Sequence, residues 1–376
     1  MSQRSLSSVD ESDVESPSGS SLKPQTLNAG SNLTTRGLSL SVSMTDVDLD
    51  TESPALSTRF STDDRFRVSL CEFRNYISQV LEPLNEVQCD GYDDEMEELH
   101  RRCIMANLKQ FVDPRSSRLT RKNRYFNVLP FFHSRVKLSV IDSEPDSDYI
   151  NANYVKVDLQ GSATTYISTQ APIVGTVPDF WRMVWEQDSR IIMMLTPLHE
   201  LNTDKSDMYW PKTVSKVKSF ANGISVRFKS EASSHDLINR VFELFRTDTP
   251  EDARTITHFQ YLGWPDHGVP GSFDSYRAVL SSYRALRDRL RCPVVVHCSA
   301  GIGRTGTFIG IDAVVDACAY ISKFGRASDT VCILDVVYTM RTQRAGMVQT
   351  KVQYQFMYEF LRYCLEFHHF DLNFSL

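Results

Sequence analysis

The segment from Arg291 to Phe308 constrains the fold of this chain more than any other feature. It begins with Pro293 to Cys298, a continuous apolar run of mostly β-branched residues, which is typical of a strand buried on both faces of a sheet. A helix should follow from Thr305 to Tyr320, because apolar residues recur there on one side. A buried strand joined to a helix by a short loop favours an α/β domain.

The loop between this strand and this helix predicts an anion site. Gly301 and Gly303 are able to adopt positive φ, so that successive backbone N–H groups can converge at the helix N-terminus. Such a site favours the thiolate form of Cys298, and the guanidinium of Arg304 can bind two phosphoryl oxygens. We therefore expect Cys298 to attack phosphorus and to become a phosphocysteine. The alternative is a buried core cysteine beside an ordinary turn.

Periodic segments elsewhere predict the rest of the domain. Strands are expected at 149–155, 165–168, 190–195 and 224–228, and helices at 178–186, 272–290, 330–344 and 350–367. A further helical period starts at Phe66 and ends near Pro83. The mixture predicts an α/β fold, a single catalytic domain with a central twisted mixed β-sheet flanked by helices.

The composition divides the chain into three parts. Residues 1–64 are rich in serine, threonine and acids, and we expect them to form a disordered tail. Residues 65–94 are expected to form an N-terminal helical segment, and residues 95–370 the catalytic domain. In the tail, Ser16-Pro17 and Ser53-Pro54 are pairs that a proline-directed kinase could phosphorylate, although serine-rich tails contain such pairs by chance.

Charge and composition argue against several classes of protein. A net charge of −6 does not suit a protein that binds nucleic acid by neutralising its phosphates. No apolar run approaches the roughly 20 residues of a membrane helix, and no apolar leader follows Met1. The eight cysteines contain no CxxC pair, so we expect a reducing, cytoplasmic location. No residues show the spacing of metal ligands, and we expect no cofactor.

Several segments together resemble one enzyme family. His297 to Gly306 resembles the signature loop of the phosphotyrosine-specific protein tyrosine phosphatases, here of the non-receptor type. The resemblance extends from about Lys122 to Phe360, and it includes an acid loop at 264–268, a glutamine loop at 349–354, a recognition loop at 122–136, and structural motifs at 148–154, 169–172, 179–181 and 209–211. It implies hydrolysis of phosphotyrosine in protein substrates without a cofactor.

The resemblance also implies roles for individual residues. Cys298 would be the nucleophile, and Arg304 would bind the phosphoryl group. Asp266 would protonate the leaving tyrosine and later accept a proton from water. Gln349 would hold the hydrolytic water with help from Gln353, although either glutamine could instead only cap a helix. The remaining loop residues would also contact the phosphate: Ser299, Ala300, Gly301, Ile302 and Gly303.

Four further residues are expected to support this chemistry. His297 would order the signature loop, and Thr305 would hydrogen-bond the departing thiolate. Glu200 would pair with Arg304 and hold its guanidinium in place. Trp264 would support the loop that carries Asp266.

Selectivity for tyrosine is expected to come from the recognition loop. The ring of Tyr125 would stack on the substrate ring and wall a pocket too deep for phosphoserine, although a tyrosine there could equally belong to the core. Asn127 would bind the substrate backbone. Phe126 stands where some relatives carry a basic residue, so we expect only a weak preference for acids before the phosphotyrosine. Phe132 departs from the aspartate that many members have.

Two alternative functions stay open. A dual-specificity phosphatase shares the cysteine-to-arginine loop, but Tyr125 and the Trp264 loop argue against it. A catalytically weak pseudophosphatase would bind phosphotyrosine as a module, but it would usually lack the acid or the nucleophile, and both are present. In the tail, Arg36–Leu40 resembles a docking motif of phosphatases that bind MAP kinases, although a single arginine makes chance the better explanation.

Overall fold

The computed structural model describes residues 66–70, 72–78, 91–108, 111, 117–159, 164–265, 268–325 and 329–367. These residues belong to one compact unit. The tail expected for residues 1–64, with its kinase motifs, lies outside the described residues. None of the helices within the described ranges has both the length and the apolar character to cross a membrane.

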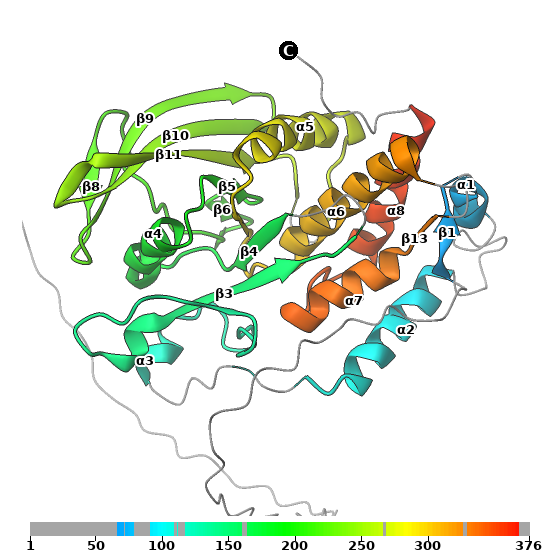
Figure 1. Ribbon diagram of the computed structural model, residues 1–376, viewed down its shortest axis with the longest axis horizontal. Helices are drawn as coiled ribbons and strands as arrows, with labels where there is room; N and C mark the ends of the chain where they lie inside the picture. Colours follow the sequence, from blue (N-terminus) through cyan, green and yellow to red (C-terminus); the bar gives the residue numbers. More distant parts are fainter. Residues whose placement is uncertain are drawn as a thin grey trace, which may run out of the picture. The chain divides into compact units, whose positions relative to one another are not determined.

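A mixed sheet of nine strands forms the centre of the domain (Figure 1). In spatial order the strands are β2 (Arg135–Lys137), β3 (Tyr149–Lys156), β4 (Thr165–Thr169), β12 (Val294–His297), β5 (Ile191–Met194), β11 (Thr249–Tyr261), β10 (Leu237–Arg246), β9 (Ile224–Ser234) and β8 (Val217–Ser219). Strands β4, β12, β5 and β11 pair in parallel, and the outer pairs are antiparallel. The strand predicted before the signature loop, β12, therefore lies inside the parallel part of the sheet.

Helices cover both faces of this sheet, which confirms the predicted α/β fold. Val294 and Val296 of β12 belong to one apolar core, and Val295 between them belongs to a second. Neighbouring residues of a strand point to opposite faces, so the two cores lie on opposite sides of the sheet. The first core includes helices α5 (Phe273–Leu290), α6 (Gly303–Phe324), α7 (Ile333–Gln343) and α8 (Lys351–Glu366), and the second includes α4 (Val177–Glu186).

The start of the described chain differs from the predicted helix. Val68–Ser69 form strand β1, which pairs with β13 (Thr330–Val331), and helix α1 is limited to Phe73–Tyr76. The prediction of a helix from Phe66 was therefore wrong at its start, and so was the prediction that the helix of α7 begins at Thr330. In both places pairing with a strand distant in sequence outweighs the local helical period.

Helix α2 (Gly91–Met105) crosses the expected boundary at residue 94 and packs on α7 and α8. Its Glu95 is buried and accepts hydrogen bonds from the hydroxyls of Tyr76 (2.5 Å), Tyr358 (2.6 Å) and Tyr354. Burial raises the pKa of Glu95, although the three hydroxyls oppose this rise. Residues 91–105 thus pack on helices that lie beside the predicted site.

Strands β9, β10 and β11 form long antiparallel hairpins, of which the sequence predicted only residues 224–228. The missed part of β9, residues 229–234, is exposed and polar, so it carries no alternation of apolar residues. Shorter elements complete the fold. They are α3 (Ser117–Thr120), before the recognition loop, and the hairpin of β6 (His199–Glu200) and β7 (Thr203–Asp204), which ends beside the signature loop.

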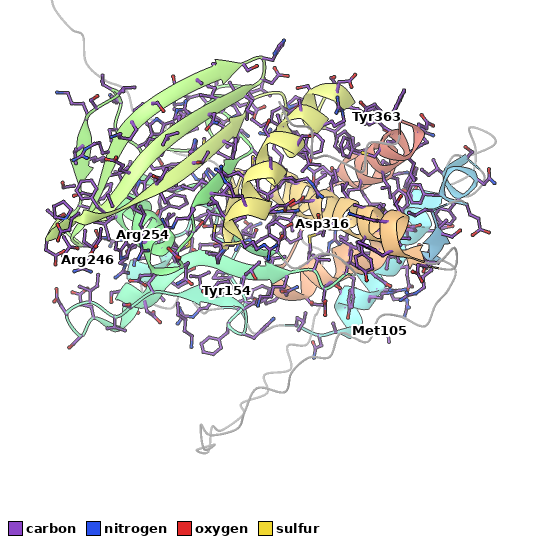
Figure 2. All side chains as sticks on the ribbon, turned by 45° about the horizontal axis from the view of Figure 1, so that its top comes forward. Met105, Tyr154, Arg246, Arg254, Asp316 and Tyr363 are labelled. Carbon is purple, nitrogen blue, oxygen red and sulfur yellow. The ribbon has the colours of Figure 1, made fainter. Side chains whose placement is uncertain are left out.

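Helices α5 and α6 are joined by a buried ionic cluster, whose Asp316 is labelled in Figure 2. Arg284 and Arg287 of α5 contact Asp312 at 2.8 and 2.7 Å and Asp316 at 2.6 and 2.9 Å. Burial would raise the pKa of Asp312, but the two guanidinium groups hold it below its ordinary value. The cluster contains two positive and two negative side chains, so its charges balance.

Candidate active site

The signature loop, residues 298–302, follows β12 at the carboxyl end of the parallel strands and leads into α6. Ligands of open α/β sheets bind at this edge. Cys298 is 6% exposed and lines a cavity of about 270 Å³ together with Ser299, Ala300, Ile302, Gly303 and Arg304. Tyr125, Asn127, Gln349 and Gln353 line the same cavity. The predicted residues from the signature, recognition and glutamine loops are therefore brought together.

The backbone of the signature loop depends on one glycine in the left-handed region. Gly301 has a φ of +71°, and a Cβ there would lie 2.0 Å from the carbonyl oxygen of Thr169. Its N–H donates to the sulfur of Cys298 at 3.3 Å. Gly303 does not have a positive φ, so that prediction was wrong, because Gly303 is already the first residue of α6.

The guanidinium of Arg304 is buried and held on three sides. Its Nη2 lies 2.8 Å from Oε2 of Glu200, and its Nη1 donates to the carbonyl of Leu195 at 3.3 Å and to the hydroxyl of Thr196 at 3.2 Å. The pairing with Glu200 is the one that the sequence predicted. It fixes the plane of the guanidinium before any ligand is bound.

A chain of buried polar groups lies behind the loop. The Nδ1 of His297 lies 3.1 Å from the carbonyl of Cys298, and its Nε2 lies 2.9 Å from the hydroxyl of Tyr209, which is 2.7 Å from Nε2 of His258. A carbonyl only accepts, so Nδ1 carries the proton and the Tyr209 hydroxyl donates to Nε2. Burial lowers the pKa of His297 to about 4 and that of His258 well below its ordinary value, so both rings are neutral. Sequence reasoning missed His258, because it predicted no strand over the residues of β11.

The recognition loop closes on the signature loop. The hydroxyl of Tyr125 lies 2.9 Å from Oγ of Ser299. Below it, Asn123 accepts hydrogen bonds from the hydroxyl of Tyr149 at 2.6 Å and from Asn151 at 2.8 Å. Phe126, the next residue at the rim, is 86% exposed.

The unusual Phe132 of the recognition segment is about half exposed. Lys137 and Arg135 lie over its ring, 5.2 and 5.8 Å from the ring centroid. The neighbouring Phe131 is buried and stacks on Phe111, with ring centroids 4.5 Å apart. Phe132 therefore lies on the protein surface, while Tyr125 keeps its contact with the signature loop.

The glutamine loop is held against α6. The Oε1 of Gln353 accepts hydrogen bonds from the N–H groups of Gln349 (3.0 Å) and Thr350 (3.3 Å), so Gln353 caps α8 as well as lining the cavity. The N–H of Val348 donates to the carbonyl of Ile302 at 3.1 Å. Gly306 leaves room for this approach, because a Cβ there would lie 2.4 Å from the nitrogen of Val348.

The acid loop and Thr305 complete the set of expected site residues. Asp266 lies outside the described residues, but Trp264 before it is 1% exposed and donates from Nε1 to the carbonyl of Gly268 at 2.9 Å. The hydroxyl of Thr305 is buried and has no hydrogen-bond partner among the residues that the structure describes. This hydroxyl can therefore donate a hydrogen bond to a group whose charge develops during a reaction.

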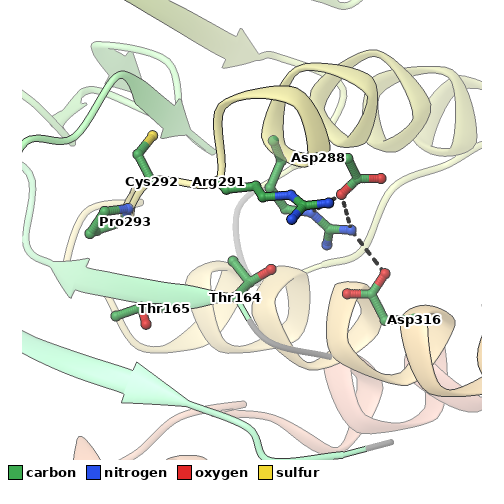
Figure 3. A pocket seen from close by; sticks show the side chains of 8 residues that line it. Thr164, Thr165, Asp288, Arg291, Cys292, Pro293 and Asp316 are labelled. Atoms are coloured by element: carbon green, nitrogen blue, oxygen red, sulfur yellow. Dashed lines mark hydrogen bonds and ion pairs between the residues drawn. The ribbon is translucent and has the colours of Figure 1, made fainter. Parts of the chain in front are cut away.

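A second cavity, of about 450 Å³, lies at the opposite end of β12 and is larger than the first (Figure 3). Charged side chains that line this cavity form ion pairs with one another: Arg287 contacts Asp288 at 2.7 Å and Asp316 at 2.9 Å. Its Cys292 is half-buried, and burial raises the pKa of that thiol. The first cavity holds the aligned sulfur, N–H and guanidinium groups, so we assign the chemistry there in spite of its smaller size.

Sequence reasoning missed one residue of this region, Arg344. Helical spacing predicts that it ends a helix, yet its side chain is 0% exposed and its guanidinium donates to the carbonyls of Gly301 and Ala300. Arginine is rarely buried to this extent, so no local pattern could have indicated it.

Comparison with known proteins agrees with this geometry. Residues 119–363 match the family model described as protein-tyrosine phosphatase. The chain is 42% identical over 240 residues to receptor-type tyrosine-protein phosphatase F of Bos taurus and 42% identical over 238 residues to tyrosine-protein phosphatase Lar-like of Caenorhabditis elegans. These matches cover 64% and 63% of this chain but only 12% and 10% of the relatives. The chain therefore belongs to the protein-tyrosine phosphatase family.

Proposed function

We propose that this chain hydrolyses phosphotyrosine in protein substrates through a phosphocysteine intermediate. The observation that carries the proposal is the alignment at one cavity of the Cys298 sulfur, which accepts the Gly301 N–H, with the Arg304 guanidinium, which Glu200 holds. A phosphoryl group in this cavity would meet a nucleophile at its base and a planar donor at its side.

In the first step the Cys298 thiolate attacks phosphorus, and the bond between phosphorus and the tyrosine oxygen breaks. Arg304 binds two phosphoryl oxygens and follows them into the transition state. The leaving phenolate has an ordinary conjugate-acid pKa near 10, so it benefits from a proton, which Asp266 supplies in this proposal.

In the second step water attacks the phosphocysteine, and inorganic phosphate and the thiolate are released. Asp266 accepts the proton of the water, and Gln349 orients that water with Gln353 behind it. The unpartnered hydroxyl of Thr305 is a donor that can stabilise the sulfur as it leaves. His297, which is neutral and bonded to the Cys298 carbonyl, holds the loop throughout.

Tyrosine selectivity in this proposal rests on the wall formed by Tyr125. Its hydroxyl is fixed to Ser299 at 2.9 Å, so the ring stands over the cavity in which the thiolate lies. Phosphoserine is too short to cross such a wall, whereas a phenyl ring can stack on it. This argues against a dual-specificity phosphatase.

A release assay tests the function directly. Wild type, Cys298→Ser and Asp266→Ala are incubated with phosphotyrosine and phosphoserine peptides in the presence of EDTA. We expect release from phosphotyrosine only, none from Cys298→Ser, and a loss of about a hundredfold or more in Asp266→Ala. If wild type binds the phosphotyrosine peptide without releasing phosphate, the chain is a binding module and the proposal fails.

Subtype and location belong to the same proposal. We place the chain among non-receptor, cytoplasmic enzymes because the cysteines of the described part are unpaired, which suits a reducing compartment. The relatives named above are receptor-type or Lar-like, so the comparisons support only the broader family. Fractionation of cells that express the natural protein tests this, and recovery in the membrane fraction would refute it.

Regulation through the tail is a weaker part of the proposal. Ser16 and Ser53 would be phosphorylated by a proline-directed kinase, and a MAP kinase would dock at Arg36–Leu40. Incubation with such a kinase followed by mass spectrometry would detect the two phosphoserines. Their absence would remove the tail from the account without affecting the catalytic domain.

A further inference from the structure

Arg344 lies directly beneath the signature loop. Its Nε donates to the carbonyl of Gly301 at 2.8 Å, and its Nη2 donates to the carbonyl of Ala300 at 3.0 Å. The remaining bonds go to the side-chain oxygens of Asn153 (2.8 Å) and Asn151 (2.9 Å). All four acceptors are neutral.

This environment differs from that of the other buried arginines in the described residues. Each of the others has a carboxylate oxygen within 3.3 Å, and they are Arg182, Arg240, Arg284, Arg287 and Arg304. Burial lowers the pKa of Arg344 to about 10, while charges on Tyr149 and Cys298 would oppose the decrease. Arg344 is therefore charged at neutral pH, and among its neighbours the Cys298 sulfur is the group that carries an anion in the reaction.

One peptide group connects Arg344 to that sulfur. The carbonyl of Ala300 and the N–H of Gly301 belong to the same trans peptide, so they point in opposite directions. The carbonyl accepts from Arg344, and the N–H donates to the sulfur of Cys298 at 3.3 Å. The guanidinium thus fixes and polarises a peptide whose other end faces the nucleophile.

The next peptide is held in the same way. The carbonyl of Gly301 accepts from Arg344 and also from the hydroxyl of Ser168 at 2.9 Å. Its partner N–H, on Ile302, consequently points away from Arg344. Buried carbonyls need such donors, and without them the peptides would be free to turn their oxygens toward a bound anion.

Asn151 connects Arg344 to the recognition loop. Asn151, which accepts from Arg344, donates to the carbonyl of Val128 at 2.7 Å and to Asn123 at 2.8 Å. Arg344 is therefore bonded directly to the signature loop and is connected to the recognition loop through Asn151.

We propose that Arg344 is a positioning residue of the phosphate site. It binds the carbonyls of Ala300 and Gly301, so that the N–H groups of Gly301 and Ile302 on the same peptides face the anion. It also supplies countercharge to the thiolate and to a bound phosphoryl group. The inference rests on the proposed function of this loop. Arg344 touches no reacting atom, so it acts only through the loop backbone and through its charge.

The test measures the loop without measuring turnover. Alkylation of Cys298 by iodoacetate is followed by mass spectrometry of its peptide between pH 4 and 9, with and without inorganic phosphate. The variants are Arg344→Met, Arg344→Lys and, as a control, Arg182→Met, which removes a buried arginine bonded to the carbonyls of Ser139 and Ser147. All variants share the other charged or titratable groups near Cys298 and Arg344. These groups are His297, Tyr149, Lys205 and the pair of Arg304 and Glu200.

We expect Arg344→Met to shift the midpoint of the alkylation profile upward by about one pH unit and to weaken phosphate protection about tenfold or more. Arg344→Lys keeps the charge but loses the planar fork, so the midpoint should stay near that of wild type while phosphate protection weakens several-fold. Arg182→Met should lower the melting temperature without changing either quantity. If Arg344 had a purely structural role, both of its variants would behave like Arg182→Met and lose stability without a change in midpoint or in phosphate protection.

The outcomes separate the two proposals. Unchanged phosphate protection in Arg344→Lys, or an unchanged midpoint in a folded Arg344→Met, overturns the positioning role. If Arg344→Met does not fold, the phosphate protection of Arg344→Lys decides alone. Absence of phosphate protection in wild type would instead overturn the proposed function.

Discussion

The two buried charge clusters of this domain differ in their balance. Between α5 and α6, two arginines face two aspartates, and every charge has an opposite within 2.9 Å. At the signature loop, Glu200 faces Arg304, but Arg344 has only neutral acceptors. Burying an unbalanced charge is costly, and a fold retains it where a ligand completes the balance. The difference therefore separates a cluster that holds helices together from one that is prepared for an anion.

We expect the largest effect on stability from removing one charge of the buried ionic cluster between α5 and α6. Asp312→Asn leaves two buried guanidinium groups facing one buried carboxylate, that of Asp316, and we expect the free energy of unfolding to fall by about 3–5 kcal/mol. The kcat of the molecules that remain folded should stay close to that of wild type. Urea unfolding and an assay at low temperature measure the two quantities. A loss of kcat without a loss of stability would break the comparison.

Protonation sharpens the comparison further. Burial lowers the folded pKa of His297 to about 4 and holds that of His258 well below its ordinary value, against 6.5 in an unfolded chain. As pH falls from 6.5 to 4 the unfolded state binds more protons, so stability decreases, by about 3 kcal/mol for His297 alone.

The variant His258→Gln isolates one of these contributions. It keeps a donor for the Tyr209 hydroxyl but cannot titrate, so its unfolding free energy should fall less steeply than that of wild type below pH 6.5. Urea unfolding at pH 7, 6, 5 and 4.5 gives the two slopes. Parallel slopes would mean that His258 is protonated in the folded protein.

Removal of the carboxylate that pairs with Arg304 should affect activity more than stability. Glu200→Gln removes the charged partner of Arg304, and we expect kcat/KM to fall about ten- to a hundredfold because the guanidinium loses its orientation. A matched control is Glu231→Gln, which removes the partner of buried Arg240 at 2.6 Å. Equal losses of kcat/KM in both variants would show that activity depends no more on the partner of Arg304 than on the partner of Arg240.

The smallest effect concerns charge at the exposed rim. Phe126→Arg adds a solvated cation next to Tyr125 in the recognition loop, and exposed charge pairs are worth up to about 1 kcal/mol. We expect kcat/KM to rise about two- to fivefold for peptides with acids before the phosphotyrosine, relative to peptides without them. A strong acidic preference already present in wild type would contradict the weak preference expected from Phe126.

Sequence reasoning succeeded where the signal was local. The apolar run before Cys298, the positive φ of Gly301 and the apolar helix from Thr305 each follow from a short window, and the structure has β12, the loop and α6 there. The capping box at Thr350 and Gln353 was also visible in four residues.

It failed where long-range contacts decide. The period at Phe66 looked helical, but Val68 pairs with Val331, which no short window contains. Arg344 finds its acceptors on β3 and on the signature loop, up to 193 residues away. Burial of a charged side chain is a property of the assembled fold, so it cannot be seen in the residue or its neighbours.

The close approach of Gly306 to Val348 has a consequence for the interpretation of missense variants. Gly306 has no functional group, yet any larger residue there would displace the backbone that carries Gln349. A scan of all substitutions should find this position as intolerant as Cys298, while the protein still folds and accumulates. Variant classification that weighs only catalytic side chains would overlook this position.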